Sequence, residues 1–182
     1  NSSGKTGTVT ALAPEGDIIL NGAPLFTSAS PQSGGGGQVN IAAQNLRMQK
    51  RGFGAILATD NRSPFKPDGI TVTVSGELTM AGSFIVTSGF DPASRAPVGN
   101  ITLTAKDIVA TQGSLISSET YASGPGGQLK VFADTLHLID GGQMKSGSTF
   151  APPFGSLPQG IIPTGPGGGI TIEARGPKPS VL

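Results

Sequence analysis

The chain contains no cysteine and no tryptophan, and only one histidine and one tyrosine. Disulfide bonds and thiolate metal sites are therefore excluded, and His137 alone cannot build a histidine metal site or a catalytic triad. Charged residues make up only 13% of the 182 residues, and 12 basic against 11 acidic side chains give a net charge of +1. This balance gives no electrostatic reason to expect nucleic acid or an anionic membrane as a partner.

Long apolar runs are also missing, since none approaches the roughly 18–20 residues that span a bilayer as a helix, and we expect no membrane span. Glycine (29 residues) and proline (15 residues) are abundant instead, a share that borders on low-complexity composition. Disorder is nevertheless not expected, because 36% of the residues are hydrophobic and the net charge is small. The chain starts at Asn1 without a methionine or a signal segment, so we interpret it as part of a longer protein.

A three-strand unit repeats along the chain about every 30 residues. Each unit has a glycine-rich lead, a short alternating strand, a brief turn, a second short strand, a glycine, and a third strand that enters a polar loop. The first inward apolar residues of the units are Val9, Val39, Val72, Ile101, Leu129 and Ile170, at spacings of 30, 33, 29, 28 and 41 residues. An insertion at residues 147–168, rich in proline and phenylalanine, expands the fifth unit.

The second and third strands recur in the same order. The second strands begin at Ile18, Leu46, Leu78, Ile108 and Leu136, and the third strands at Leu25, Ile56, Phe84, Leu115 and Met144. Their length of three to five residues and their period-two alternation are typical of β-strands. A β-sandwich also has short alternating strands, but it has no reason to repeat one three-strand order five times. The sequence therefore predicts an all-β fold: a right-handed parallel β-helix, that is, a three-faced β-solenoid with about five full coils and a partial sixth, in one domain over residues 1–182.

Three phrases carry a resemblance to a known family: Gly126-Gly-Gln-Leu-Lys-Val, Asp140-Gly-Gly-Gln-Met-Lys-Ser-Gly-Ser-Thr and Gly167-Gly-Gly-Ile-Thr-Ile-Glu-Ala. They resemble the repeats of filamentous-haemagglutinin-like proteins, large adhesins that Gram-negative bacteria export by two-partner secretion. The resemblance covers the chain from Gly4 to Ala174. It implies a secreted or cell-surface β-helix on the bacterial exterior, and a filament is one form it could take.

An enzyme is the main rival, because parallel β-helices include polysaccharide lyases and hydrolases, which need clustered carboxylates. The repeat alignment places Asp17, Glu77, Asp107 and Asp134 just before the second strands, with Asn45 in the same column. We interpret this turn column as side chains that bond to nearby backbone N–H groups. A stacked divalent-cation site is the alternative, and no base or second acid is registered with the column for catalysis.

Two other motifs have structural explanations. The glycine runs Gly34 to Gly37, Gly126-Gly127 and Gly167 to Gly169 fall between coils, where turns with positive φ explain them without a nucleotide. The Asn-x-Ser/Thr matches at Asn1, Asn61 and Asn100 are expected by chance in a chain rich in serine and threonine.

The third strands carry an unusual feature. If the first residue of each third strand points inward, then Phe26, Leu57, Ile85 and Ile116, here called the third-strand row, point outward, and Lys145 ends the row. Such a row of exposed apolar residues has two explanations. A loop containing Phe65, Phe90, Phe150 or Phe154 covers it, or a partner chain or neighbouring filament binds it.

The expected function is thus a structural and adhesive β-helix module of a large secreted or cell-surface protein, without catalytic activity, cofactor or metal. Its partners would be other protein chains or further coils of the same protein, stacked end to end. Surface glycans are also open as ligands. The alternative function is a carbohydrate-binding or carbohydrate-cleaving β-helix.

Overall fold

The computed structural model describes residue 4 and residues 6–65, 67–89, 95–149, 162–175 and 180–181 of the chain. These residues form strands and turns and contain no helix, so none could cross a membrane as a helix. Short alternating segments separated by glycine and polar turns explain this, since they cannot sustain a helical apolar stripe.

The strands occupy three positions around each coil. Those in the first position are β1 (Thr8–Asn21), β3 (Gln38–Gln49), β5 (Gly69–Val74), β8 (Asn100–Thr104), β11 (Leu129–Ala133) and β14 (Ile170–Ala174). Those in the second are the C-terminal parts of β1 and β3, then β6 (Glu77–Ala81), β9 (Asp107–Thr111), β12 (Thr135–Leu138) and β15 (Ser180–Val181). Those in the third are β2 (Pro24–Ala29), β4 (Ile56–Asn61), β7 (Phe84–Gly89), β10 (Leu115–Thr120) and β13 (Gln143–Ser148).

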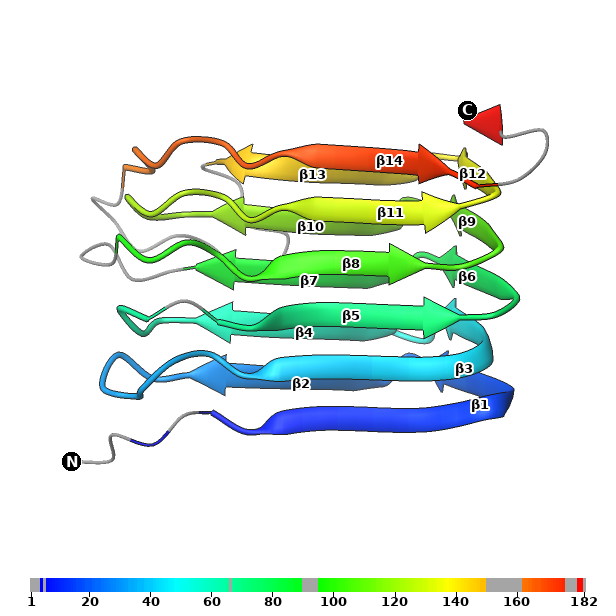
Figure 1. Ribbon diagram of the computed structural model, residues 1–182, viewed down its shortest axis with the longest axis horizontal. Coiled ribbons are helices and arrows are strands. Elements are labelled where there is room, and N and C mark those ends of the chain that lie inside the picture. The colour runs from blue at the N-terminus through cyan, green and yellow to red at the C-terminus, as the bar shows by residue number, and fades with distance from the viewer. Residues whose placement is uncertain are drawn as a thin grey trace.

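Each strand pairs in parallel with the strand at the same position one coil later, and the stack of coils is visible in Figure 1. One sheet contains the first and second positions, because β1 and β3 run continuously through the corner between them. The third position forms a separate five-stranded sheet. The predicted parallel β-solenoid is thereby confirmed.

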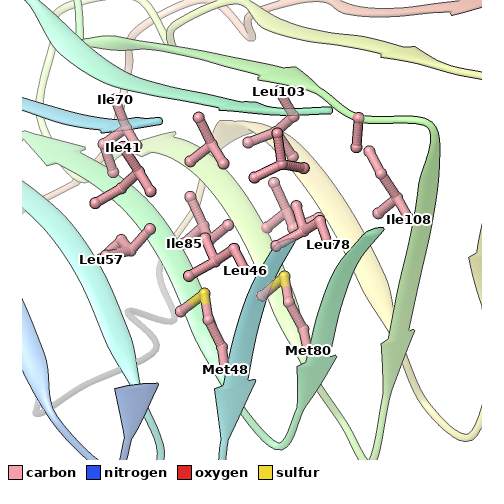
Figure 2. Packing of buried hydrophobic residues seen from close by; sticks show 14 of the residues in the cluster. Ile41, Leu46, Met48, Leu57, Ile70, Leu78, Met80, Ile85, Leu103 and Ile108 are labelled. Atoms are coloured by element: carbon pink, nitrogen blue, oxygen red, sulfur yellow. The ribbon is translucent and has the colours of Figure 1, made fainter. Parts of the chain in front are cut away.

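The core lies between the two sheets and consists of columns of apolar side chains, some of which Figure 2 shows. The second strands stack as predicted, with Leu46, Leu78 and Ile108 paired in sequence and fully buried. Each large aliphatic side chain buried in such a column stabilises the fold by roughly 1.5–3 kcal/mol. The fold is therefore stabilised by repetition of the same contact from coil to coil.

One register on the first face differs from the sequence alignment. Val39 pairs with Ile70, which pairs with Ile101, whereas Val72 pairs with Ile41. The predicted position of Val72 was wrong by two residues. Because side chains alternate with a period of two, this shift leaves Val72 inward and fully buried, as expected.

The glycine runs have a different cause from the predicted one. Only Gly35 in these runs has a positive φ, of 140°. Gly37, Gly127 and Gly168 are instead required by space: a Cβ on Gly37 would lie 2.8 Å from the Cβ of Thr27, and one on Gly127 would overlap the hydroxyl of Ser118. Close approach between the two sheets, rather than turn geometry, explains why glycine recurs there.

The expected insertion at residues 147–168 is described only at its two ends, since residues 150–161 lie outside the described residues. On its N-terminal side β13 continues to Ser148, and on its C-terminal side β14 begins at Ile170. Leu129 pairs with Ile170 across the insertion, so the strand ladder continues in register.

Candidate functional site

The third-strand row is not an outward surface. Leu57, Ile85 and Ile116 are fully buried members of the core, and Figure 2 shows Leu57 and Ile85 among the core side chains. The prediction that these three side chains point outward was wrong, and with it the proposed covered or partner-binding row. Phe26 alone is exposed, at 60%. Of the phenylalanines expected to cover the row, Phe65 is 57% exposed, and Phe90, Phe150 and Phe154 lie outside the described residues.

The prediction failed because the repeat alignment shifted some of the third strands by one residue relative to the others. The inward column is Leu25, Leu57, Ile85, Ile116 and Met144, as the strand pairing shows. The alignment matched Leu25 with Ile56 and Leu115 with Met144, although Ile56 pairs with Pro24 and Leu115 with Gln143. Adjacent apolar residues such as Ile56 and Leu57 make both registers look plausible, and a shift of one residue exchanges the two faces of a strand.

The outer side of the same sheet carries two carboxylates that the sequence alignment did not group. Asp60, Ser88 and Glu119 are register partners on successive strands, so Asp60 and Glu119 stand about 10 Å apart. Asp60 and Glu119 each lie four residues after the first residue of a third strand. This shared position in the repeat is the sequence signal that could have grouped them. The Ser117 hydroxyl donates a 2.6 Å hydrogen bond to Glu119, whose side chain is buried.

Burial raises the pKa of two side chains in this region, Asp60 and Tyr121. Desolvation raises the pKa of Asp60, opposed by Arg62, whose Nε lies 3.2 Å from the carboxylate, and by a hydrogen bond from Ser28. Burial likewise raises the pKa of the Tyr121 hydroxyl, and the neighbouring Glu119 carboxylate raises it further. Oδ1 of Asp60 is buried without a hydrogen-bond partner. Ionisation of this carboxyl group therefore lowers the stability of the fold.

The turn column is held together by its own hydrogen bonds. The amide of Asn45 donates to Asp17 at 2.7 Å, and its oxygen accepts from the backbone N–H of Glu77 at 2.8 Å. Thr135, rather than the expected Asp134, is the register partner of Asp107, and its hydroxyl donates to that carboxylate at 2.6 Å. Bonding to a nearby backbone N–H is as predicted for Asn45. No group of three acids, histidines or cysteines that could hold a metal ion occurs in the part of the chain that the structure describes.

Two other predicted positions are also settled by the structure. His137 pairs with Val109 on the outer side of the second face and is half-buried. Asn61 is buried, and its amide donates to the carbonyls of Ser63 and Phe65, so its Asn-x-Ser match organises the loop. This arrangement leaves the Asn61 amide inaccessible for modification in the folded chain.

Exposed apolar side chains gather at two places that were not singled out from the sequence. At one end of the solenoid, Ile170 and Ile172 of β14 are 44% and 39% exposed, although their register partners Leu129 and Val131 are fully buried. At the corner between β3 and β4, Phe53 is 93% exposed beside the exposed side chains of Lys50 and Arg51.

Comparison with known proteins gives no relative from which a function could be carried over. No family model, no curated protein and no solved structure matches this chain. The functional argument therefore depends on the surfaces described above.

Proposed function

We propose that this chain is an extracellular structural and adhesive β-solenoid module of a large secreted or cell-surface protein, serving attachment or the assembly of filaments and matrix. The observation that carries the proposal is the terminal rung at β14. Ile170 and Ile172 continue two core columns but remain exposed, because no described strand pairs with the outer side of β14.

Such a rung can accept a further strand at the first position of the solenoid. Val9 and Ala11 begin the same two columns on β1, at the opposite end of the stack (Figure 1). A first-position strand placed beyond β14 would therefore repeat the parallel pairing that β11 and β14 already make. Apolar residues on an exposed strand edge favour such pairing.

The repeat resemblance supports the proposed location. The glycine-rich phrases at Gly126 and Gly167 resemble those of filamentous-haemagglutinin-like adhesins, which are exported to the cell exterior. Within these phrases, Gly127 and Gly168 leave no room for a Cβ beside the hydroxyls of Ser118 and Ser146 on the other sheet. A solenoid, which can be extended coil by coil, suits attachment and assembly outside the cell. We propose no catalytic role for it.

End-to-end assembly tests the proposal directly. The purified chain should show a molar mass that rises with concentration in light scattering. Ile170→Lys combined with Ile172→Lys places two charges in the apolar columns, and this variant should remain monomeric. Thr171→Lys is the matched control, because Thr171 lies between them on the outward side of β14 and should leave association unchanged. A chain that stays monomeric at every concentration, or a double variant that associates like the parent chain, would contradict the proposal.

A further inference from the structure

The corner between β3 and β4 is longer than its neighbours and is here called the basic corner, residues 50–55. Six residues separate β3 from β4, whereas two separate β1 from β2 and two separate β6 from β7. The flanking strands stay in register, since Gln49 pairs with Ala81 and Ile56 with Phe84. The additional residues therefore leave the core unchanged and project from the coil.

The base of the basic corner is packed against the corners above and below it. A Cβ on Gly22 would overlap the carbonyl of Arg51 and lie 2.9 Å from its Cβ, and one on Gly82 would lie 2.9 Å from Cδ of Lys50. Gly22 and Gly82 thus provide the space in which residues 50 and 51 are seated. The projection begins from a fixed position.

The tip stands clear of the rest of the chain. Gly52 has a φ of 75°, and a Cβ added to it would have no atom within 4 Å. The next residue, Phe53, is 93% exposed. A phenylalanine this exposed is unusual even for a surface residue, because its whole ring is apolar. The corner is therefore convex, with an apolar tip.

Positive charge surrounds this tip. Lys50 and Arg51 are exposed, and neither belongs to an ion pair of the described residues. Arg47, on the strand that leads into the corner, makes only a 3.9 Å contact with Asp17 between two exposed side chains. Contacts of this kind neutralise little charge. A chain with a net charge of only +1 thus places two cationic side chains, Lys50 and Arg51, close in sequence to one exposed aromatic ring.

We infer that the basic corner attaches the solenoid to an anionic lipid surface, with the Phe53 ring inserted at the headgroup level and Lys50 and Arg51 against the lipid phosphates. The inference names a partner for the proposed attachment role and rests on that role. Apolar tips insert into bilayer interfaces, and adjacent lysine and arginine side chains bind anionic headgroups while their stems follow the apolar layer.

The shape and chemistry of the corner favour a lipid surface over an anionic glycan. A glycan chain is bound in a groove by polar groups that reach its hydroxyls, with an aromatic ring as one wall. The basic corner instead projects, and Phe53 has no polar atom with which to bind a sugar hydroxyl. A flat, deformable anionic surface fits a convex tip of this composition.

The absence of tryptophan provides a direct test. Phe53→Trp introduces a single indole at the tip, and its fluorescence is measured with vesicles of phosphatidylglycerol and phosphatidylcholine. We expect a blue shift with these vesicles at low salt. We expect none with phosphatidylcholine alone and a loss of the shift near 1 M salt, where the screening length falls to about 3 Å. Lys50→Gln and Arg51→Gln should each weaken binding roughly fivefold, and Phe53→Ser about tenfold or more.

Matched controls use residues of the same kind elsewhere on the surface. Phe26→Trp places the indole at another exposed position, on β2 with no basic residue next to it in the sequence, and should show no shift. Lys130→Gln removes an exposed charge from β11 without weakening binding. Three results would overturn the inference: no shift for Phe53→Trp, an equal shift for Phe26→Trp, or a shift produced by a soluble anionic polysaccharide and not by vesicles. End-to-end association, measured without lipid, should be the same in Phe53→Ser, so failure of lipid binding is distinguishable from failure of the proposed function.

Discussion

The hydroxyl of Thr87 donates a 2.7 Å hydrogen bond across the core to the backbone carbonyl of Gly99. Ser118, the register partner of Thr87, donates to the same carbonyl at 2.9 Å, and Ser146 repeats the contact with Gly127 at 2.7 Å. The inward side of the third strands therefore carries a hydroxyl column opposite glycines on the other sheet. Backbone carbonyls at the start of the first strands accept hydrogen bonds from these hydroxyls inside the protein.

The hydroxyls of this column are not all hydrogen-bonded, so removing a hydroxyl should affect stability differently at two of its positions. Thr59 pairs with Thr87 in the column and is equally buried, but its hydroxyl has no hydrogen-bond partner. Thr87→Val removes a satisfied hydroxyl and should lower the free energy of unfolding by about 1 kcal/mol. Thr59→Val removes an unsatisfied one and should leave stability unchanged or raise it by about 1 kcal/mol. Urea unfolding of both variants measures the difference, and a loss of similar size at both positions would contradict the assignment.

The glycines opposite this column should be intolerant of even one methyl group. A Cβ at Gly127 would meet Ser118 Oγ and the carbonyl of Gly99, two groups that cannot withdraw without opening the sheets. Gly127→Ala should therefore cost about 2–3 kcal/mol of stability, the usual size of an overpacking effect. Gly7→Ala is the control, since nothing lies within 4 Å of its Cβ position. Equal melting temperatures for the two variants would show that the sheets separate more easily than the structure indicates.

Asp60 predicts a dependence of stability on pH. Burial raises its pKa in the folded state, so folding favours the protonated carboxyl. Its favourable contribution is present below the unfolded pKa of about 3.9 and is lost as pH rises through the higher folded value. Asp60→Asn should remove this decrease in the free energy of unfolding with rising pH. The variant should be at least as stable as the parent chain at neutral pH. Arg62→Gln should make this decrease in the free energy of unfolding larger, because Arg62 opposes the rise in the pKa of Asp60. Unfolding free energies measured across this pH range test both, and an unstable Asp60→Asn at neutral pH would contradict the assignment.

Repetition made the architecture predictable, because the order of three strands and a glycine recurs often enough to exclude other all-β folds. The second-strand register was predictable for a related reason: Leu46 and Leu78 each have polar neighbours on both sides, so one face is specified. On the third strands Ile56 and Leu57 are both apolar, and the pattern does not choose between them. The structure resolves this through the strand pairing, which extends over the polar residues Thr59 and Thr87 as well.

The surfaces were harder to predict than the core. Phe53 lies between the second and third strands of its unit, where the repeat pattern predicts only a glycine, and the paired strands on either side reveal that the corner is extended. The effect of burial on Asp60 was also outside the reach of the sequence, because its cause is tertiary. Local patterns determine which residues are strands, whereas exposure and electrostatics depend on how the coils meet.

The corrected third-strand register can itself be tested by a pair of substitutions. The sequence alignment placed Phe26 and Ile85 on the same outward row, but the structure exposes Phe26 and buries Ile85 completely. Ile85→Ala deletes core methyl groups and should lower the free energy of unfolding by about 2–5 kcal/mol, with little relief because strands pack on both sides. Phe26→Ala should change it by no more than about 0.5 kcal/mol, as for an ordinary surface position. The opposite ranking in denaturant unfolding would restore the outward row and would place Ile56 and Phe84 in the core.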